Sequence, residues 1–272
     1  MDQIHWFPGH MAKAKRQLAE MVRYLDVILE IRDARIPLAS HNGDLDALLE
    51  KRPTVVVLNK ADLAEPSANA AWQQWFTSRG QTALPVNGKD GQGVKEVWRA
   101  LTKVLPAARF ARARRVGVVG IPNVGKSTIL NRMLGTGAAK TGNLPGITRG
   151  KQWIKREGFE ILDTPGLMPP KVQSDEEGLK LAWVGTIRDE IIPSYDLALL
   201  LFERYGATLF KWGGEDPALA SSEEKLDWFA RKRGFLIKGG EPDLNRAAIT
   251  LLKEFRDGRL GRISLEKPEI QE

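Results

Sequence analysis

Apolar residues recur along this chain with two different spacings. Short segments rich in apolar or β-branched residues predict buried strands at residues 26–31, 54–58, 83–86 and 116–119. Two further segments, 152–155 and 159–162, predict a hairpin around Gly158. Apolar side chains three or four positions apart predict helices at residues 11–25, 72–79, 94–104 and 128–134. Strands that alternate with helices predict an α/β fold whose mostly parallel sheet is covered on both faces.

The pattern changes near residue 176. Helical spacing predominates from there on, at residues 179–192, 197–205, 222–233 and 244–257. Glycine pairs at 213–214 and 239–240 separate the predicted helices. We therefore expect two domains, an α/β domain over residues 1–175 and a small all-helical domain over residues 176–272.

Composition narrows the class of protein. Hydrophobic residues make up 42% of the chain, which is ordinary for a globular protein with a core. The chain has no cysteine, which excludes disulfides and thiolate metal sites, and neither a membrane-spanning apolar run nor a secretory leader is visible in it. We expect a cytoplasmic monomer that makes no membrane contact.

The net charge of +7 is uneven. Residues 1–175 carry 26 of the 41 basic side chains but only 16 of the 34 acidic ones. Two basic clusters stand out in that part of the chain, the first formed by Lys13, Lys15 and Arg16, and the second by Arg109, Arg112, Arg114 and Arg115. Such clusters favour nucleic-acid contact, although a solvated surface is the simpler alternative for either one.

The segment from Gly120 to Ser127 matches the phosphate-binding loop pattern G-x-x-x-x-G-K-[ST]. It follows a predicted strand and opens a predicted helix, so its backbone N–H groups can cradle phosphates. Lys126 is expected to reach the β- and γ-phosphates of a nucleotide, and the Ser127 hydroxyl to bind Mg²⁺. The candidate nucleotide-binding residues of this segment are Asn123, Val124, Gly125, Lys126, Ser127 and Thr128.

Guanine selectivity is predicted by Asn59-Lys60-Ala61-Asp62, which ends a predicted strand. The Asp62 carboxylate can accept hydrogen bonds from guanine N1–H and the exocyclic amine, a pair that adenine does not offer. A site built on such bonds rejects the wrong base by roughly 10⁴ in comparable cases. Asn87 and Gly88 follow the next predicted strand and are candidates for backbone contacts with the base.

Asp163-Thr164-Pro165-Gly166 completes the constellation. Asp163 is a candidate to hold Mg²⁺ through a water, and the Gly166 N–H is a candidate donor to the γ-phosphate. Thr148 lies in a Gly- and Thr-rich segment and is expected to close on Mg²⁺ when the γ-phosphate is present. Thr148 is therefore both a metal and a catalytic candidate, and Lys126 is a catalytic candidate too.

The order of these motifs is reversed relative to ordinary nucleotide-binding domains of this type. Asn59 to Asp62 precedes the phosphate loop, and in this order the chain resembles the circularly permuted GTPases. The opening segment Trp6-Phe7-Pro8-Gly9-His10-Met11-Ala12-Lys13-Ala14 and the segment Asp33-Ala34-Arg35-Ile36-Pro37 resemble the ribosome biogenesis GTPase A family (RbgA/YlqF). The resemblance covers the whole GTP-binding domain.

This resemblance implies a P-loop GTPase domain with permuted strand order, followed by an RNA- or ribosome-binding helical domain. It implies an assembly factor that binds ribosomal RNA on the precursor of the large ribosomal subunit and is released after GTP hydrolysis. The implied cofactors are GTP or GDP, Mg²⁺ and K⁺. Asn123 is the implied K⁺ ligand, with loop shaping as an equal alternative.

Leu167 occupies the position where a glutamine would orient the attacking water. Leucine cannot orient a water, and the family resemblance points to His10 as the replacement, with a loop-shaping or RNA-contacting role as the alternative. Leu167 also keeps open a non-enzymatic, GTP-dependent RNA-binding scaffold. An ATP-dependent enzyme is a second alternative, and Asp62 argues against it.

Overall fold

The structure is a computed structural model that describes residues 16, 18–50, 52–105, 113–135, 153–156, 158–164, 166–169, 172–187, 191–213 and 221–269. Its contacts divide the chain into two units. The first comprises residues 2–171 together with residues 264–272, and residues 172–263 belong to the second. The helical unit therefore lies, in sequence, between two parts of the other.

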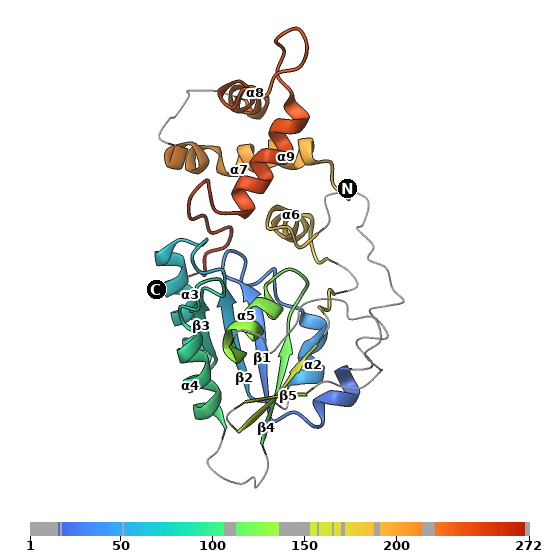
Figure 1. The fold of residues 1–272 in the computed structure, drawn as a ribbon, viewed down its shortest axis with the longest axis vertical. Helices are drawn as coiled ribbons and strands as arrows, with labels where there is room; N and C mark the ends of the chain where they lie inside the picture. Colours follow the sequence, from blue (N-terminus) through green and yellow to red (C-terminus); the bar gives the residue numbers. More distant parts are fainter. Residues whose placement is uncertain are drawn as a thin grey trace. The chain divides into compact units, whose positions relative to one another are not determined.

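The first unit is built on a six-stranded sheet in the order β3-β2-β1-β4-β6-β5 among its described residues (Figure 1). All neighbouring strands are parallel except the β5–β6 hairpin, whose connection includes Gly158 at φ +81°. The strands are β1 (Val27–Asp33), β2 (Thr54–Asn59), β3 (Thr82–Val86), β4 (Arg114–Val119), β5 (Trp153–Arg156) and β6 (Phe159–Asp163). The parallel sheet and the hairpin confirm the predicted α/β class.

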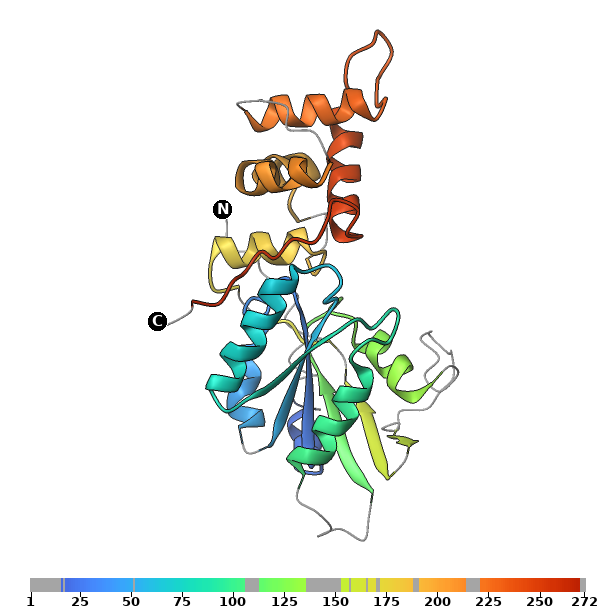
Figure 2. The ribbon, with the colours of Figure 1, turned by 90° about the vertical axis from the view of Figure 1, so that its left-hand side faces the viewer.

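Helices cover both faces of this sheet (Figure 2). The chain steps from β1 to β3 in one direction along the sheet and then returns to β4, so right-handed crossovers put α2 and α3 on one face and α4 and α5 on the other. The elements are a 3₁₀ turn (Gly43–Leu45), α2 (Asp46–Leu49), α3 (Pro66–Ser78), α4 (Val94–Val104) and α5 (Lys126–Leu134). Helix α3 begins six residues before the predicted start at Trp72, because Pro66 is well suited to a first helical position.

Two clusters of buried side chains share the face covered by α2 and α3. Trp72 and Phe76 of α3 pack on Val56 and Leu58 of β2. Farther along the sheet, helical residues 18–22 pack with Leu25, Ile28, Val119 and other apolar side chains. Burial of this kind contributes about 25 cal/mol per Å² to folding and holds these helical segments on the sheet.

The second unit is helical in its described part. Helices α6 (Asp175–Trp183), α7 (Ser194–Gly213), α8 (Ser222–Lys232) and α9 (Leu244–Arg256) form it. Ser221 and Glu224 make a capping box at the start of α8, and the Asp243 side chain caps α9. Helix α6 ends nine residues before the predicted end at Ile192, because the chain turns at Gly185, where φ is +78°.

Residues 264–269 belong to the first unit, whereas the sequence pattern assigned them to the helical domain. We call these residues the C-terminal strap. Leu265 and Glu266 are buried, and the Trp72 indole N–H donates to the Glu266 carbonyl oxygen at 3.1 Å. The strap carries no periodic apolar pattern that could have predicted where it packs.

Candidate functional site

The loops that carry the predicted motifs meet at one edge of the sheet, where the parallel strands β1, β2, β3, β4 and β6 have their carboxyl ends. Asp33 pairs with Asn59, Asn59 pairs with Val86, and Val118 pairs with Asp163 in register. Loops at such an edge, where the order of strands along the sheet reverses, form the usual ligand crevice of an open α/β sheet. The strand β4 and the phosphate loop stand next to this point.

The phosphate loop has a backbone that most residues cannot adopt. Gly120, Asn123 and Gly125 have φ values of +148°, +62° and +92°. A Cβ atom at Gly120 would lie 2.4 Å from the carbonyl oxygen of Ile31, and one at Gly125 would lie 2.3 Å from the Asn59 amide nitrogen. Two glycines are therefore required for this loop to pass so close to β1 and β2 just before α5 begins.

Asn59 joins the predicted guanine motif to the phosphate loop. Its amide nitrogen donates to the Val124 carbonyl oxygen at 2.7 Å, and its amide oxygen accepts from the Gly88 N–H at 3.0 Å. Asn59 as a whole is 3% exposed, so both hydrogen bonds are shielded from water. One side chain thus fixes three of the predicted nucleotide-binding segments relative to one another.

Lys60 makes a second connection between the same two motifs. Its ammonium group donates to the Asn123 carbonyl oxygen at 2.8 Å and forms an ion pair with the Asp33 carboxylate at 2.9 Å. Lys60 has a φ of +61°, and it and Asn123 are the non-glycine residues with positive φ in the described part of the chain. Such a backbone costs of order 1–3 kcal/mol and persists only where its surroundings enforce it.

Asp33 and Arg35 form a buried layer beneath Lys60 that the sequence did not assign to the site. The Arg35 guanidinium binds both carboxylate oxygens of Asp33, at 3.0 and 2.9 Å, and the Asp33 side chain is fully buried. Burial opposes ionisation, but Arg35 and Lys60 outweigh it and hold the pKa of Asp33 far below its ordinary value. The charged residues at the end of β1 and just after it were the signal for this layer.

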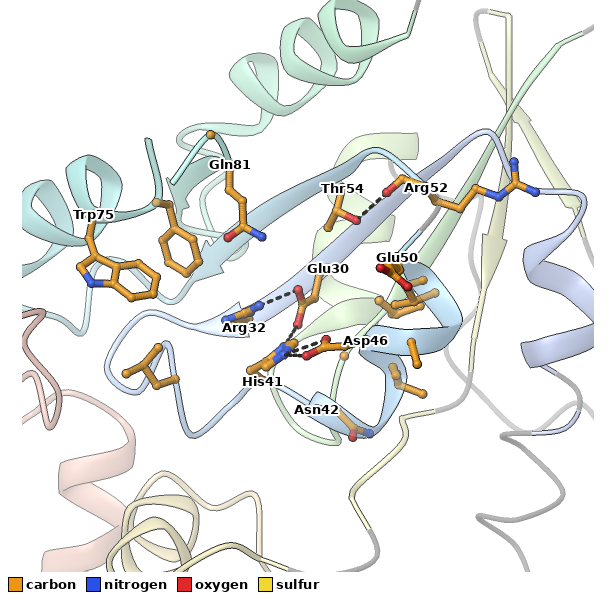
Figure 3. A pocket seen from close by; sticks show the side chains of 18 residues that line it. Glu30, Arg32, His41, Asn42, Asp46, Glu50, Arg52, Thr54, Trp75 and Gln81 are labelled. Carbon is orange, nitrogen blue, oxygen red and sulfur yellow. Dashed lines mark hydrogen bonds and ion pairs between the residues drawn. The ribbon is translucent and has the colours of Figure 1, made fainter. Parts of the chain in front are cut away.

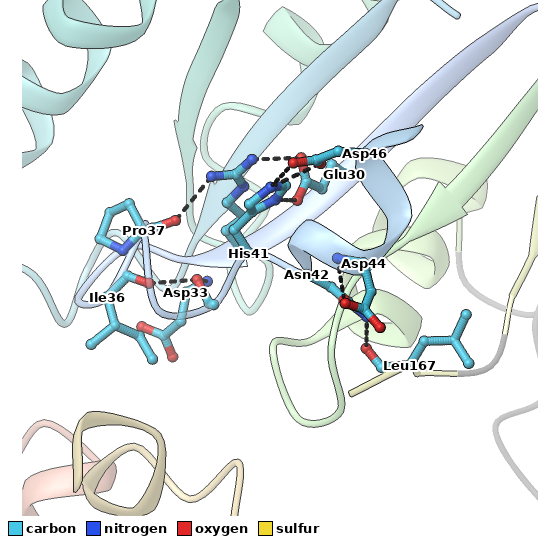
Figure 4. Close-up of polar contacts among 11 residues, drawn as sticks. Glu30, Asp33, Ile36, Pro37, His41, Asn42, Asp44, Asp46 and Leu167 are labelled. Atoms are coloured by element: carbon cyan, nitrogen blue, oxygen red, sulfur yellow. Dashed lines mark hydrogen bonds and ion pairs between the residues drawn. The ribbon is translucent and has the colours of Figure 1, made fainter. Parts of the chain in front are cut away.

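Lys126 and the Gly166 segment complete the described site. The Lys126 ammonium donates to the carbonyl oxygens of Gly120 and Ile121 at 3.1 and 2.8 Å. A Cβ atom at Gly166 would lie 2.9 Å from that ammonium nitrogen, so a glycine allows this approach. The carbonyl oxygen of Leu167 accepts from the Asn42 side chain at 2.8 Å (Figure 4).

The remaining predicted residues fall into three groups. In the first turn of α5, Ser127 is half-buried and Thr128 is exposed. Asp62 is half-buried in the turn after β2. The Asn87 side chain forms hydrogen bonds within its own loop, to the Asp90 carboxylate and the Lys89 N–H. The backbone of Asp163 ends β6, but its side chain lies outside the described residues. His10 and Thr148 also lie outside them.

The described members of the second basic cluster have partners inside the sheet region. Arg115 pairs with Glu160 at 2.9 Å, and the Arg114 guanidinium lies 5.8 Å from the centre of the Phe159 ring. These contacts give both side chains a local structural role. Lys13, Lys15, Arg109 and Arg112 lie outside the described residues.

A cavity of about 670 Å³ lies on the sheet face covered by α2 and α3, and Gly120 is among its lining residues (Figure 3). Glu30 in its wall pairs with Arg32 at 2.8 Å and with His41 at 2.7 Å. Burial opposes the charge on Glu30, but Arg32 and the hydrogen bond from His41 prevail and lower the pKa of Glu30 to about 2. For His41, burial is outweighed by the hydrogen bonds to Glu30 and Asp46, and its pKa is raised.

Within the described ranges, no helix combines the length and the apolar character needed to cross a bilayer.

Comparisons with known proteins show which family the chain resembles. A family profile described as "50S ribosome-binding GTPase" matches residues 115–225, which include the phosphate loop. The chain is 39% identical to ribosome biogenesis GTPase A of Bacillus cereus, covering 98% of this chain and 94% of that protein. It is 33% identical to mitochondrial ribosome-associated GTPase 1 of Mus musculus, covering 99% of this chain and 92% of the relative.

Two solved structures of a protein named YlqF are also similar to this chain. The crystal structure of GNP-bound YlqF from T. maritima superposes with a TM-score of 0.72 at 33% identity, covering 95% of this chain and 100% of that one. The GDP-bound structure of the same protein gives a TM-score of 0.71 and covers 94% of this chain.

Proposed function

Because this chain belongs to the ribosome biogenesis GTPase A family and is a GTP hydrolase, we propose that it is an assembly factor for the large ribosomal subunit. In this proposal it binds ribosomal RNA on the precursor particle in the GTP state and leaves after hydrolysis. The family profile and the names of the bacterial and mitochondrial relatives support the ribosomal role. GTP hydrolysis argues against the scaffold alternative, in which the nucleotide would only be structural.

The observation that carries the nucleotide-binding part of the proposal is the pair of contacts from Asn59 to Val124 and from Lys60 to Asn123. They bring a guanine-recognition motif encoded early in the chain onto a phosphate loop encoded later. We assign base recognition to Asp62, with backbone contacts from Asn87 and Gly88. We assign phosphate binding to the segment from Asn123 to Thr128 and to the N–H of Gly166.

The described residues also fit the cations that the family implies. Ser127 stands in the first turn of α5, after Gly125, which precedes the helix, and Lys126, its first residue. A hydroxyl in that position can ligate Mg²⁺. Thr148 and Asp163 are proposed to complete that site. Asn123 is proposed as the K⁺ ligand. Its left-handed backbone supports this proposal, because a non-glycine residue keeps such a conformation only where its surroundings enforce it. The two cations would neutralise charge on the phosphates.

We propose His10 as the residue that orients the attacking water, because Leu167 has no polar side chain. Leu167 is also 4% exposed and packs in the core cluster with Ile28 and Val119, so it is committed to a structural role. Hydrolysis would then depend on the opening segment of the chain adopting its active position on the ribosomal particle. This dependence explains why a particle would stimulate turnover.

GTP turnover, measured with and without purified large subunits and in K⁺ or Na⁺, tests the proposal. We expect stimulation by subunits and faster turnover in K⁺. The His10→Ala variant should keep its GTP affinity and lose about 10²-fold or more of the stimulated rate, the usual effect of removing one positioned group.

Two controls keep the outcomes distinct. Small subunits should not stimulate turnover, and equal stimulation by both subunits would refute the large-subunit role. The Asp62→Ala variant should lose its preference for GTP over ATP while retaining phosphate contacts. An unchanged stimulated rate in His10→Ala would remove His10 from the mechanism but leave the ribosomal role intact.

A further inference from the structure

We propose that Glu266 of the C-terminal strap is a positioning residue for the guanine nucleotide, acting on Lys60 through the loop of residues 33–40. The proposal concerns nucleotide affinity in the free protein. It needs only the GTP-binding activity of the chain and is independent of the ribosomal role.

The strap holds this loop at three points. The Glu266 carboxylate accepts hydrogen bonds from the Leu38 N–H at 2.7 Å and the Ala39 N–H at 3.2 Å. The Leu265 and Glu266 N–H groups donate to the Arg35 carbonyl oxygen at 3.0 and 3.2 Å. Glu266 is 8% exposed, and hydrogen bonds to a charged, buried acceptor are about twice as strong as neutral ones.

The loop is closed internally, so a displacement at Leu38 is passed on to Asp33. The Ser40 hydroxyl accepts from the Asp33 N–H at 3.0 Å and donates to the Ile36 carbonyl oxygen at 2.6 Å. The Ile36 N–H in turn donates to the Asp33 carbonyl oxygen at 3.0 Å. Asp33 and Ser40 are fully buried, which leaves this ring of bonds no water to exchange with.

Asp33 then orients Lys60, whose ammonium lies 2.9 Å from the carboxylate and 2.8 Å from the Asn123 carbonyl oxygen. The lysine depends on this support because its own backbone is in the left-handed region. Weakening the strap should let the Lys60 ammonium leave the phosphate loop part of the time. The nucleotide pocket would then be preformed in a smaller fraction of molecules, which lowers the apparent affinity by that fraction.

Dissociation of fluorescent GDP and GTP from the Glu266→Gln variant tests this inference. The substitution preserves volume and removes the charge. We expect dissociation to be faster by about tenfold, a common size for coupling between two sites. Glu266→Gln in a Lys60→Ala background should change dissociation little further, because the two residues act in one path.

Hydrogen exchange provides a second readout that does not need tight nucleotide binding. In the nucleotide-free Glu266→Gln variant, amides of residues 120–125 should exchange faster as well as those of residues 36–40. Faster exchange confined to residues 36–40, with unchanged nucleotide dissociation, would mean that Glu266 only stabilises its own loop and would overturn the proposal. An equal fold-change in the wild-type and Lys60→Ala backgrounds would overturn it too.

Glu269→Gln is the matched control. Glu269 lies on the same strap and carries the same charge, but it is exposed. Its substitution should leave both nucleotide dissociation and exchange at residues 120–125 unchanged. An effect as large as that of Glu266→Gln would point to net charge in place of the bonds to Leu38 and Ala39.

Discussion

At the scale of single residues, the polar contacts of Asn59, Lys60 and Asp33 connect loops that are distant in the sequence. Each has its partners in another loop or strand, and Asn59 and Asp33 are almost completely buried. Removing Asn59 would leave the buried Val124 carbonyl oxygen and Gly88 N–H unpaired, at a cost of about 1–3 kcal/mol for each neutral group. These side chains therefore combine stability with the shape of the site.

The ion pairs of His41 give a prediction at the same scale. Its pKa is raised above the ordinary 6.5, mainly by the hydrogen bond to Glu30 against the opposing effect of burial. The folded state therefore binds the proton more tightly than the unfolded state. The resulting stabilisation is complete below pH 6.5 and is lost as the pH rises through the raised pKa of His41. The free energy of unfolding, measured by urea titration across this range, should fall.

The His41→Gln variant supplies the comparison for that measurement. It keeps a polar side chain of similar length but cannot titrate, so this decrease with pH should disappear. A decrease of the same size in both proteins would mean that another group is responsible. Glu30 affects stability at low pH. Its contribution to the free energy of unfolding is present above its ordinary pKa of 4.5 and is lost as the pH falls towards about 2.

At the scale of elements, the sheet retains an ordinary doubly wound arrangement although the order of its motifs is permuted. The strand with the phosphate loop still lies centrally, between β1 and β6. The chain reaches the same neighbours by a different route, because pairing and right-handed crossovers depend on local connections and not on which strand comes first. The glycines of the phosphate loop then set how closely the loop approaches β1 and β2.

Gly125→Ala tests that approach. Gly125 has a φ of +92°, and an added Cβ would lie 2.3 Å from the Asn59 amide nitrogen. We expect a loss of stability of about 1 kcal/mol from backbone strain and a further loss from the displaced Asn59, together with weaker GDP binding. Calorimetry and nucleotide titration measure the two effects.

Gly80→Ala is the control for the strain alone. Gly80 has a φ of +71°, but a Cβ there meets nothing within 4 Å. Its stability should fall by the strain component only, and nucleotide affinity should not change. Comparable losses of affinity in the two variants would contradict the assignment of the close contact.

The local pattern predicted the elements well where packing and propensity agree. Helix α4 has the predicted bounds, Val94–Val104, because its apolar spacing and the surrounding loops leave no alternative. Helix α7 is longer than the predicted 197–205, extending over Ser194–Gly213, because Gly206 within it does not end the helix. Propensity costs of about 1 kcal/mol for such a glycine are readily offset by tertiary packing.

The sequence predicted those residues of the candidate site that belong to recognisable motifs. Asn59, Lys60 and the phosphate loop were identified from their types and spacing, and the structure brings them into contact. Asp33, Arg35 and Glu266 were not assigned to the site. Glu266 lies more than two hundred residues from Leu38 in the sequence, and no periodicity reports a pairing of that kind.

At the scale of the whole molecule, the first unit is completed by residues from the far end of the chain. The strap buries Leu265 and Glu266 against the 33–40 loop and α3. Its Ser264 hydroxyl accepts from the Glu65 N–H at 3.0 Å, just before α3 begins. The GTP-binding unit is therefore not a contiguous segment of the sequence.

Deletion of residues 264–272 gives a prediction at this scale. The truncated chain should lose protection from hydrogen exchange in residues 34–40 and in α3, because those segments lose their partners. Helices α7, α8 and α9 should keep their protection, since their described core lies within residues 172–263. Loss of protection in those helices, with α3 unaffected, would contradict the assignment of the strap to the first unit.

The helical unit is therefore an insertion in the sequence of the first unit, and the chain connects the two units at both ends of the insertion. The first connection follows Leu167 and Met168, which lie next to the phosphate loop. The second connection leads to Leu265, which lies next to the loop of residues 33–40. Both connections to the helical unit therefore begin at residues bonded to the sheet edge that carries the predicted nucleotide site. The Leu167 N–H donates to the Gly120 carbonyl oxygen at 3.3 Å, and the Leu265 N–H donates to the Arg35 carbonyl oxygen at 3.0 Å.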